Sequence, residues 1–361
     1  MCACGTSSTE GDAGVPQDAG PPGDAGSIDD GGTPPDAGNP WGPVEQAVRA
    51  ASADAGVPDL ALYVFDANDR AVYRLELGSF RSSDTIAVAS SSKWISTMVI
   101  FDVIRRGQLS LDSTTGQVLG WTGPQSAITL RHLLSFTSGL ESEAACTLNP
   151  LTTLAACVDT ISAAPLVADA GTRFDYGSTH LHVAGRMAEV ASGKSWDTLF
   201  GEVLRTPLQL APTTTYYALP NQQLGQQNPL LAGGLRVTPD DYAKLLAMEF
   251  HKGRGQVGTP ALFDEQAKTP FPNAIIGKSP MPARTYDIRY GLGAWVECDT
   301  PATGCAVVSS PGAFGFTPWV DREHGYYAMV AMQVSRANNG VVNFSVELEQ
   351  QVQPRIVEAM R

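Results

Sequence analysis

A Ser-x-x-Lys sequence stands where a strand-like run meets a helix pattern, and this junction constrains the chain more than any other feature. Ser90 and Lys93 follow the run Asp84–Ala89 and precede an amphipathic helix pattern from Trp94 to Arg106. Residues three apart share one face of a helix, so the serine hydroxyl and the lysine amine would point the same way. Because most positions of this helix are apolar, we expect it to be buried in the middle of the molecule.

A serine hydroxyl becomes a nucleophile only when a base removes its proton, and Lys93 is the candidate base. Burial disfavours the ammonium form, so a buried amine can be neutral at working pH. The helix N-terminus would also favour negative charge on the serine oxygen. The alternative is a purely structural role, with Ser90 as the N-cap of the helix and Lys93 as a solvated residue of its first turn.

Two further segments carry residues that suit the same chemistry. Tyr176 lies in a loop before a helix pattern, where its phenol could project into a cleft. We expect a nearby lysine ammonium to lower the pKa of that phenol, so that it can shuttle a proton. The segment Ser309–Phe316 brings glycines to the entry of a strand, where a backbone N–H could supply half of an oxyanion hole. The alternatives are a core tyrosine and an ordinary turn.

Composition excludes several functional classes. The chain has 361 residues, 43% of them hydrophobic and 17% charged, which suffices for a sizeable core. Its net charge of −13 argues against nucleic acid or an anionic membrane as partner, because both require a basic face. No apolar run is long enough to predict a transmembrane segment.

The N-terminal region and the cysteines point to an exported protein. Residues 1–40 repeat Asp-Ala-Gly with interleaved prolines and predict a disordered tether ahead of a domain over residues 41–361. The start resembles a bacterial lipoprotein after removal of its signal peptide, with a lipid anchor at Cys4 or Cys2 and a periplasmic or cell-surface location. A start-site artefact or a cloning remnant is the alternative reading.

The remaining four cysteines form two local pairs. Cys146 with Cys157, and Cys298 with Cys305, are each close enough in sequence to predict a disulfide, with buried free thiols as the alternative. Their spacings do not match a zinc site, and we expect no metal and no other cofactor.

The order of the predicted elements indicates an α/β (α+β) fold with an antiparallel sheet built from both ends of the chain. A helix over 41–50 and a strand hairpin over 60–77 come first, and a helical lobe of roughly residues 108–285 is inserted. Further predicted strands are Leu292–Cys298, Cys305–Ser309, Phe314–Asp321 and Tyr326–Gln333, and predicted helices are Leu181–Ser192, Trp196–Leu204, Pro239–Phe250 with Thr238 as N-cap, and Val342–Met360.

Taken together, these segments resemble the serine β-lactamase-like hydrolases, which include class C β-lactamases, D-alanyl-D-alanine carboxypeptidases and family VIII-type esterases. The resemblance covers roughly residues 42–360. The segments that carry it are Ala87–Lys93, Gly107–Asp112, Thr129–Leu140, Tyr176-Gly-Ser178 in place of Tyr-x-Asn, Gly233–Leu235 with Thr238, Tyr290–Gly293, and Ser310-Pro311-Gly312 in place of Lys-Thr-Gly or His-x-Gly.

The resemblance implies a role for each matched residue. Ser90 would be the acylated nucleophile, and Lys93 and Tyr176 would share the general acid and base work. The backbone N–H groups of Ser90 and Ala313 would form the oxyanion hole. The remaining substrate-binding positions would be Ser178, Ser310, Gly312 and Ala313.

The third motif departs from the family pattern, and this decides between substrates. Ser310 replaces the lysine or histidine that holds a substrate carboxylate, and Pro311 removes a hydroxyl and an N–H. Losing such a charge-assisted contact costs roughly 1.5–3 kcal/mol. We therefore expect a carboxylesterase or amidase, with a β-lactamase or D,D-carboxypeptidase as the alternative and a non-catalytic binding protein as a further one.

Two groups of nearby residues stay open at this stage. Four aromatic residues close to the motifs could line an apolar substrate pocket or belong to the core: Tyr217, Trp295, Phe316 and Trp319. His180 and His182 would permit a Ser-His-Asp mechanism, but their helix pattern favours a place in the lobe.

Overall fold

A seven-stranded antiparallel sheet joins the two ends of the chain, as the sequence predicts. Its strand order is β2-β1-β12-β11-β10-β9-β8, so the N-terminal hairpin pairs with the C-terminal strands through β1 and β12. The strands are β1 (Ala61–Asp66), β2 (Ala71–Glu76), β8 (Arg289–Tyr290), β9 (Trp295–Val296), β10 (Val307–Ser309), β11 (Thr317–Asp321) and β12 (Tyr326–Ala331). The predicted α+β class is therefore confirmed.

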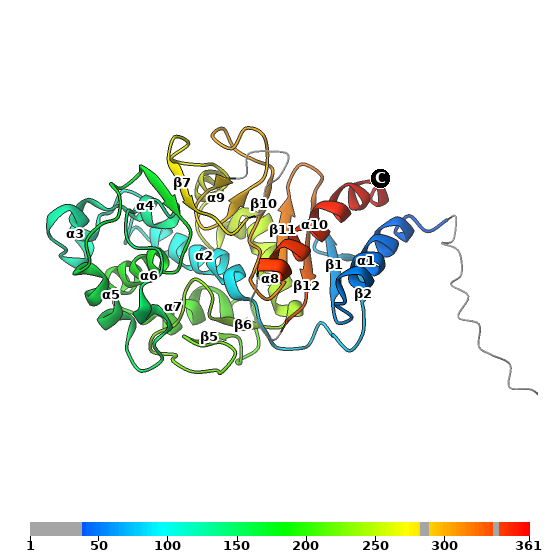
Figure 1. Ribbon diagram of the computed structural model, residues 1–361, viewed down its shortest axis with the longest axis horizontal. Helices are drawn as coiled ribbons and strands as arrows, with labels where there is room; N and C mark the ends of the chain where they lie inside the picture. Colours follow the sequence, from blue (N-terminus) through cyan, green and yellow to red (C-terminus); the bar gives the residue numbers. More distant parts are fainter. Residues whose placement is uncertain (1–37, 282–288, 335–338) are drawn as a thin grey trace, which may run out of the picture. The chain divides into compact units, whose positions relative to one another are not determined.

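Residues 38–281, 289–334 and 339–361 are described in this computed structural model, and Asn39–Arg361 form one compact unit (Figure 1). The predicted tether and the candidate anchors Cys2 and Cys4 lie outside the described residues, apart from the last residues before Trp41. The predicted end of the helical lobe, near residue 285, also lies outside them. These assignments stay predictions.

Alternation along β1 assigns its side chains to two different cores. Leu62 and Val64 pack in one apolar cluster with residues of α1 (Gly42–Ala55) and α10 (Asn339–Ala359). Tyr63 and Phe65 point the other way, into the larger cluster that includes the helices around α2. Successive side chains of a strand point to opposite faces, so a strand buried throughout needs a core on each side. Figure 1 shows α1 in blue and α10 in red side by side next to the sheet.

The helix after the Ser-x-x-Lys serine runs through the middle of the larger core. This helix, α2 (Ser92–Arg105), is buried at every position from Ser92 to Val103, which confirms the predicted burial. The other helices of this region are α3 (Thr115–Leu119), α4 (Leu130–Leu134), α5 (Leu154–Ser162), α6 (Thr179–Ser192), α7 (Trp196–Phe200), α8 (Pro239–Phe250) and α9 (Pro260–Gln266). Helix α8 contacts β11 and β12.

The structure has two small sheets whose pairings the sequence did not predict, and the predicted strand-like run Asp84–Ala89 contains one of their strands, β3. Strand β6 (Leu235–Val237) pairs on one side with β3 (Ile86–Ala87) and on the other with β5 (Thr215–Tyr216). Strand β4 (Arg173–Asp175) pairs in parallel with β7 (Ile275–Lys278). These short strands bring residue 90, residue 176 and the 230s together from distant parts of the sequence.

Several element boundaries differ from the prediction for local reasons. The run Leu292–Cys298 is not one strand, because Gly293 has a φ of 73° and separates β8 from β9. Strand β11 starts at Thr317 rather than Phe314, because Gly312 N–H donates to the Phe316 carbonyl (2.7 Å) and closes a turn. The helix from Trp196 changes to a π-turn over Gly201–Arg205. The N-cap Thr238 is confirmed, since its side chain accepts from the N–H of Asp241.

Both predicted cysteine pairs are disulfides. Cys146 is bonded to Cys157, and Cys298 is bonded to Cys305. Disulfides persist in oxidising compartments, so they indicate an extracytoplasmic setting. Among the described helices, none is long and apolar enough to cross a membrane.

Candidate active site

A strained turn presents Ser90 at the start of α2. Ser90 is half-buried within a 3-10 turn (Ala89–Ser91), and the preceding Ala89 has a φ of 45°. A non-glycine residue in this left-handed region costs on the order of 1 kcal/mol, so its surroundings must hold it there. The Ser91 hydroxyl donates to the carbonyl of Ser310 (2.6 Å), and the Tyr242 hydroxyl donates to the carbonyl of Ser91 (2.9 Å). Neighbouring elements therefore hold the turn that carries Ser90 in place.

Lys93 meets the geometric requirement for a base acting on Ser90. Its Nζ atom donates hydrogen bonds to Ser90 Oγ (3.0 Å) and to the carbonyl of Ala232 (2.8 Å). The side chain is 3% exposed, and this burial lowers the pKa of Lys93 from 10.5 to about 7, against an opposing influence of Glu143. A neutral amine is therefore well populated near neutral pH, so the solvated first-turn alternative is wrong.

Tyr176 lies beside both of these residues. The Lys93 Nζ atom is 4.5 Å from the centroid of the Tyr176 ring. The ring stacks on Trp295, with centroids 5.3 Å apart and planes 21° apart. The expectation of a lowered phenol pKa is wrong. Burial raises the pKa of Tyr176, and its contact with the Ser90 hydroxyl only partly offsets this effect. The phenol therefore keeps its proton at working pH and is a donor rather than a phenolate.

The third motif packs directly against the Ser90 turn. The Ser310 hydroxyl donates to the backbone carbonyl of Ser90 (3.2 Å). A Cβ on Gly312 would lie 2.2 Å from the Val88 carbonyl, so this close approach requires glycine. The half-buried Ala313 follows, and its backbone N–H has no recorded hydrogen-bond partner within the described chain. These contacts place the backbone of Ala313 next to the turn that carries the serine.

The structure distinguishes between the aromatic residues and histidines that the sequence left open. Trp295 contacts Tyr176, whereas Phe316 and Trp319 are fully buried core residues. His180 makes no hydrogen bond to Ser90; its two ring nitrogens lie 2.8 Å from Ser138 Oγ and 2.8 Å from the Asp175 carbonyl. His182 is also buried. The Ser-His-Asp alternative therefore lacks a histidine at the serine.

Phe136, which the sequence did not indicate as a site residue, packs against the ring of Tyr176. Phe136 is fully buried with a φ of 58°, and its ring lies 5.4 Å from Tyr176, 5.0 Å from His180 and 4.7 Å from Tyr290. A bulky residue in the left-handed region is an outlier that tertiary contacts must maintain. The sequence around Phe136 carries no signal for a left-handed backbone conformation at this residue.

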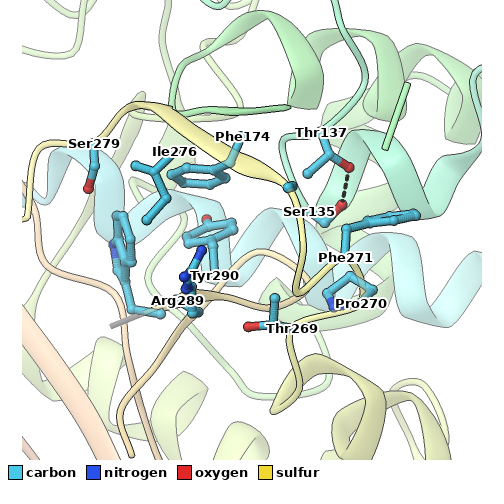
Figure 2. A pocket seen from close by; sticks show the side chains of 12 residues that line it. Ser135, Thr137, Phe174, Thr269, Pro270, Phe271, Ile276, Ser279, Arg289 and Tyr290 are labelled. Carbon is cyan, nitrogen blue, oxygen red and sulfur yellow. Dashed lines mark hydrogen bonds between the residues drawn. The ribbon is translucent and has the colours of Figure 1, made fainter. Parts of the chain in front are cut away.

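A small cavity borders the same aromatic group. Its volume is about 20 Å³, and its lining includes Phe174, Ile276, Tyr290 and Trp295 (Figure 2). Figure 2 shows the Arg289 side chain beside Tyr290 and the hydrogen bond between Ser135 and Thr137 at the cavity edge. Such a volume holds roughly one water molecule, so the cavity as it stands is too small for a substrate group.

Within the described residues, no group of three or more histidine, cysteine or acidic side chains has a geometry that could hold a metal ion. Of the sequence-predicted residues, Lys93 lies in the first turn of α2, and the others lie on turns, at strand ends or at a helix start: Ser90, Tyr176, Ser178, Ser310, Gly312 and Ala313. Ser178 is the N-cap residue of α6, two residues after Tyr176.

A sequence model of the Beta-lactamase family matches residues 44–346. This chain belongs to the beta-lactamase family. Members of that family are serine hydrolases that act on esters, amides or β-lactams. The family match therefore confirms the resemblance to serine β-lactamase-like hydrolases that the sequence motifs indicate.

Individual relatives show how broadly this fold is used. A beta-lactamase candidate from Bacteroides dorei is 30% identical, with a TM-score of 0.75 over 87% of this chain and 98% of that one. The LovD6 mutant of simvastatin synthase from Aspergillus terreus shares the fold at 20% identity, with a TM-score of 0.68 over 89% of this chain and 95% of that one. The hydrolase EstCE1, which has promiscuous acyltransferase activity, shares it at 17% identity, with a TM-score of 0.66 over 85% and 98%.

A curated relative gives a shorter match. Penicillin-binding protein 4 of Amycolatopsis lactamdurans is 29% identical over 182 residues, which is 46% of this chain and 46% of that protein. The match thus spans about half the length of that relative. It supports the family and leaves the substrate of this beta-lactamase family member open.

Proposed function

We propose that this protein hydrolyses an ester or a neutral amide through a covalent acyl-enzyme on Ser90. The observation that carries the proposal is the contact of Lys93 Nζ with Ser90 Oγ at 3.0 Å, combined with a lysine pKa of about 7. A base is most effective when its pKa lies near the operating pH. The Lys93 amine can then accept the Ser90 proton without a histidine.

In the proposed acylation step, the Ser90 O–H proton passes to Lys93 Nζ while Oγ bonds to the substrate carbonyl carbon. The resulting oxyanion accepts hydrogen bonds from the backbone N–H groups of Ser90 and Ala313. Donors of this kind contribute most when they are fixed in advance. The close packing of Gly312 against Val88 supports a fixed position for the Ala313 N–H.

Collapse of the tetrahedral intermediate needs a proton on the leaving group. Tyr176 is suited to this role because its raised phenol pKa keeps the proton in place. The phenol O–H donates to the leaving oxygen or nitrogen, and the Lys93 ammonium returns a proton to the phenol. In deacylation, water takes the place of the leaving group and the proton transfers run in reverse.

The ester or neutral amide preference depends on the third motif. Ser310 uses its hydroxyl to hold the Ser90 carbonyl and carries no charge, and Pro311 has no N–H. A substrate carboxylate would lose a charge-assisted contact worth roughly 1.5–3 kcal/mol. Ser178 lines the same side as Tyr176 in this proposal and offers a hydroxyl to the substrate.

The test uses short-chain p-nitrophenyl esters with the unmodified protein and the variants Ser90→Ala and Tyr176→Phe. We expect Ser90→Ala to abolish turnover and Tyr176→Phe to lower kcat by about 100-fold or more. Full turnover by Ser90→Ala would exclude this mechanism.

A β-lactamase or D,D-carboxypeptidase activity is the second candidate, and membership of the beta-lactamase family favours it. Nitrocefin turnover comparable to ester turnover, or a penicillin adduct on Ser90, would support it. A non-catalytic binding protein remains a third candidate. Labelling of Ser90 by a fluorophosphonate would exclude that candidate, because labelling needs an activated serine.

A further inference from the structure

The backbone after Tyr176 is clamped by a neighbouring loop. The N–H of Thr179 donates to the Ser142 carbonyl (3.0 Å), and the N–H of Ala144 donates to the Thr179 hydroxyl (2.8 Å). A Cβ on Gly177 would lie 2.1 Å from the same Ser142 carbonyl, so only glycine permits this approach. The loop around Ser142 is thus held directly against the start of α6.

This clamp brings a carboxylate to the site. Ser178 follows Tyr176 by two residues, and its N–H donates to an Oε atom of Glu143 (3.1 Å). The Glu143 side chain is exposed, and no ion pair to it is recorded in the described part of the chain. By contrast, the neighbouring Glu141 pairs with Lys278 at 2.8 Å. Within residues 38–281, 289–334 and 339–361, no ion pair balances the charge of the Glu143 carboxylate.

The charge of Glu143 reaches both proton-transfer groups. Burial lowers the pKa of Lys93, and Glu143 acts in the opposite direction. Burial raises the pKa of Tyr176, and Glu143 adds to that increase. The hydrogen bond from the Ser178 N–H to Glu143 places this carboxylate beside a predicted substrate-binding residue that follows Tyr176 by two positions.

The described residues of the third motif supply no compensating cation on the opposite side of the site. The third motif contributes Ser310 and Pro311, neither of which is charged. Lys278, whose carbonyl accepts from the N–H of Tyr176 (2.9 Å), is already paired with Glu141. Glu141, Lys278 and Glu143 together leave one net negative charge at this edge.

We propose that Glu143 determines substrate choice by favouring esters or amides that carry a cationic group, such as an ammonium, close to the scissile carbonyl. The inference rests on the proposed acyl-transfer function of Ser90 and adds the charge of its substrate. A carboxylate-bearing substrate is disfavoured by the same charge. Because Glu143 is exposed, the effective dielectric constant lies between the protein-surface value and that of water, and one charge pair at roughly 6–7 Å then changes kcat/KM by roughly tenfold.

The experiment compares three p-nitrophenyl esters of matched shape. The acyl groups are 4-trimethylammoniobutyrate, its neutral isostere 5,5-dimethylhexanoate, and monoanionic glutarate. A second pair places trimethylammonium or tert-butyl on the leaving alcohol. The variant is Glu143→Gln, whose amide oxygen can still accept from the Ser178 N–H, and the charge control is Glu358→Gln in the exposed end of α10.

We expect the unmodified protein to prefer the cationic over the neutral ester by roughly tenfold in at least one pair, and to use glutarate least. Glu143→Gln should reduce the ratio of the cationic to the neutral rate to about one, whereas Glu358→Gln should leave that ratio as it is in the unmodified protein. Raising the salt concentration should reduce the preference in the unmodified protein only.

Equal rates on cationic and neutral esters in both pairs, or a preference that survives in Glu143→Gln, would overturn the assignment of Glu143. If the assignment of Glu143 fails in this way, the proposed function still stands provided that Ser90→Ala loses activity on every ester and Glu143→Gln does not. If no ester is hydrolysed and Ser90 takes no label, the proposed function fails first.

Discussion

Replacing Lys93 with methionine should lower activity strongly and yet stabilise the protein near neutral pH. Burial lowers the pKa of Lys93 from 10.5 to about 7. Each pKa unit corresponds to about 1.4 kcal/mol, so the buried amine costs the fold about 4 kcal/mol at pH 7. Between pH 7 and pH 10.5 the unfolded chain binds one more proton at this lysine than the folded chain does. The free-energy cost of the buried amine therefore declines as the pH rises, and it is about 1 kcal/mol at pH 9.5.

The substitution also removes hydrogen bonds from Nζ to Ser90 Oγ and to the Ala232 carbonyl. Leaving that carbonyl without a partner costs about 1–3 kcal/mol. We therefore expect Lys93→Met to raise the free energy of unfolding by about 2 kcal/mol at pH 7 and to lower it by about 1 kcal/mol at pH 9.5. Turnover should fall at least about 100-fold at both pH values.

Urea unfolding followed by tryptophan fluorescence at the two pH values measures this difference. Lys252→Met, which removes an exposed amine, is the control for losing one surface charge. A stability difference between Lys93→Met and the unmodified protein that does not change with pH would refute the reasoning. So would a Lys93→Met variant that keeps its activity.

Three further predictions follow from the same geometry. The kcat/KM for a neutral ester should rise with pH along an acid limb near pH 7, because Lys93 with its lowered pKa of about 7 must be neutral to act as base; a flat profile from pH 5 to 8 would argue against that role. Phe136→Ala should lower the free energy of unfolding by about 3–5 kcal/mol. It should also reduce kcat more than it changes KM, because the Phe136 ring supports Tyr176. Steady-state kinetics on the folded fraction would show an unchanged kcat if Phe136 were only a core residue. Replacing Cys146 and Cys157 together with serine should lower stability by about 2–3 kcal/mol, measurable as a fall in Tm, and unchanged Tm would mean that this bond adds nothing to the fold.

Local sequence patterns predicted the frame of this fold well. The continuous apolar run of β1 requires a core on each side of the strand, and the structure has both. Thr238 caps α8 because a side-chain oxygen before Pro239 meets the first free N–H groups of the helix. The spacing of Ser90 and Lys93 was also sufficient, because one helical turn brings their side chains together.

The electrostatics of the site could not be predicted in the same way. The Tyr176 phenol is surrounded by Trp295, Tyr290 and Phe136, which come from separate segments, and their packing makes burial the dominant influence on its pKa. The position of Glu143 depends on a backbone contact between Ser142 and Gly177. Neither contact has a signal in sequence spacing, because both depend on tertiary packing.

Some aromatic residues near the motifs were ambiguous for a related reason. Trp319 and Phe316 are adjacent in sequence to the third motif, yet both are fully buried. Strand alternation turns Trp319 toward the α1 and α10 side, away from Ser90. Proximity in sequence to a motif therefore does not establish proximity to the reaction centre.

The most direct test of the account is whether Ser90 becomes acylated. Intact-protein mass spectrometry after rapid quenching with a p-nitrophenyl ester should show the mass of one acyl group on the unmodified protein, and peptide mapping should place it on Ser90. The Ser90→Ala variant should show no adduct and no turnover. An adduct of the same mass on Ser90→Ala, or turnover without any adduct at Ser90 in the unmodified protein, would contradict the account.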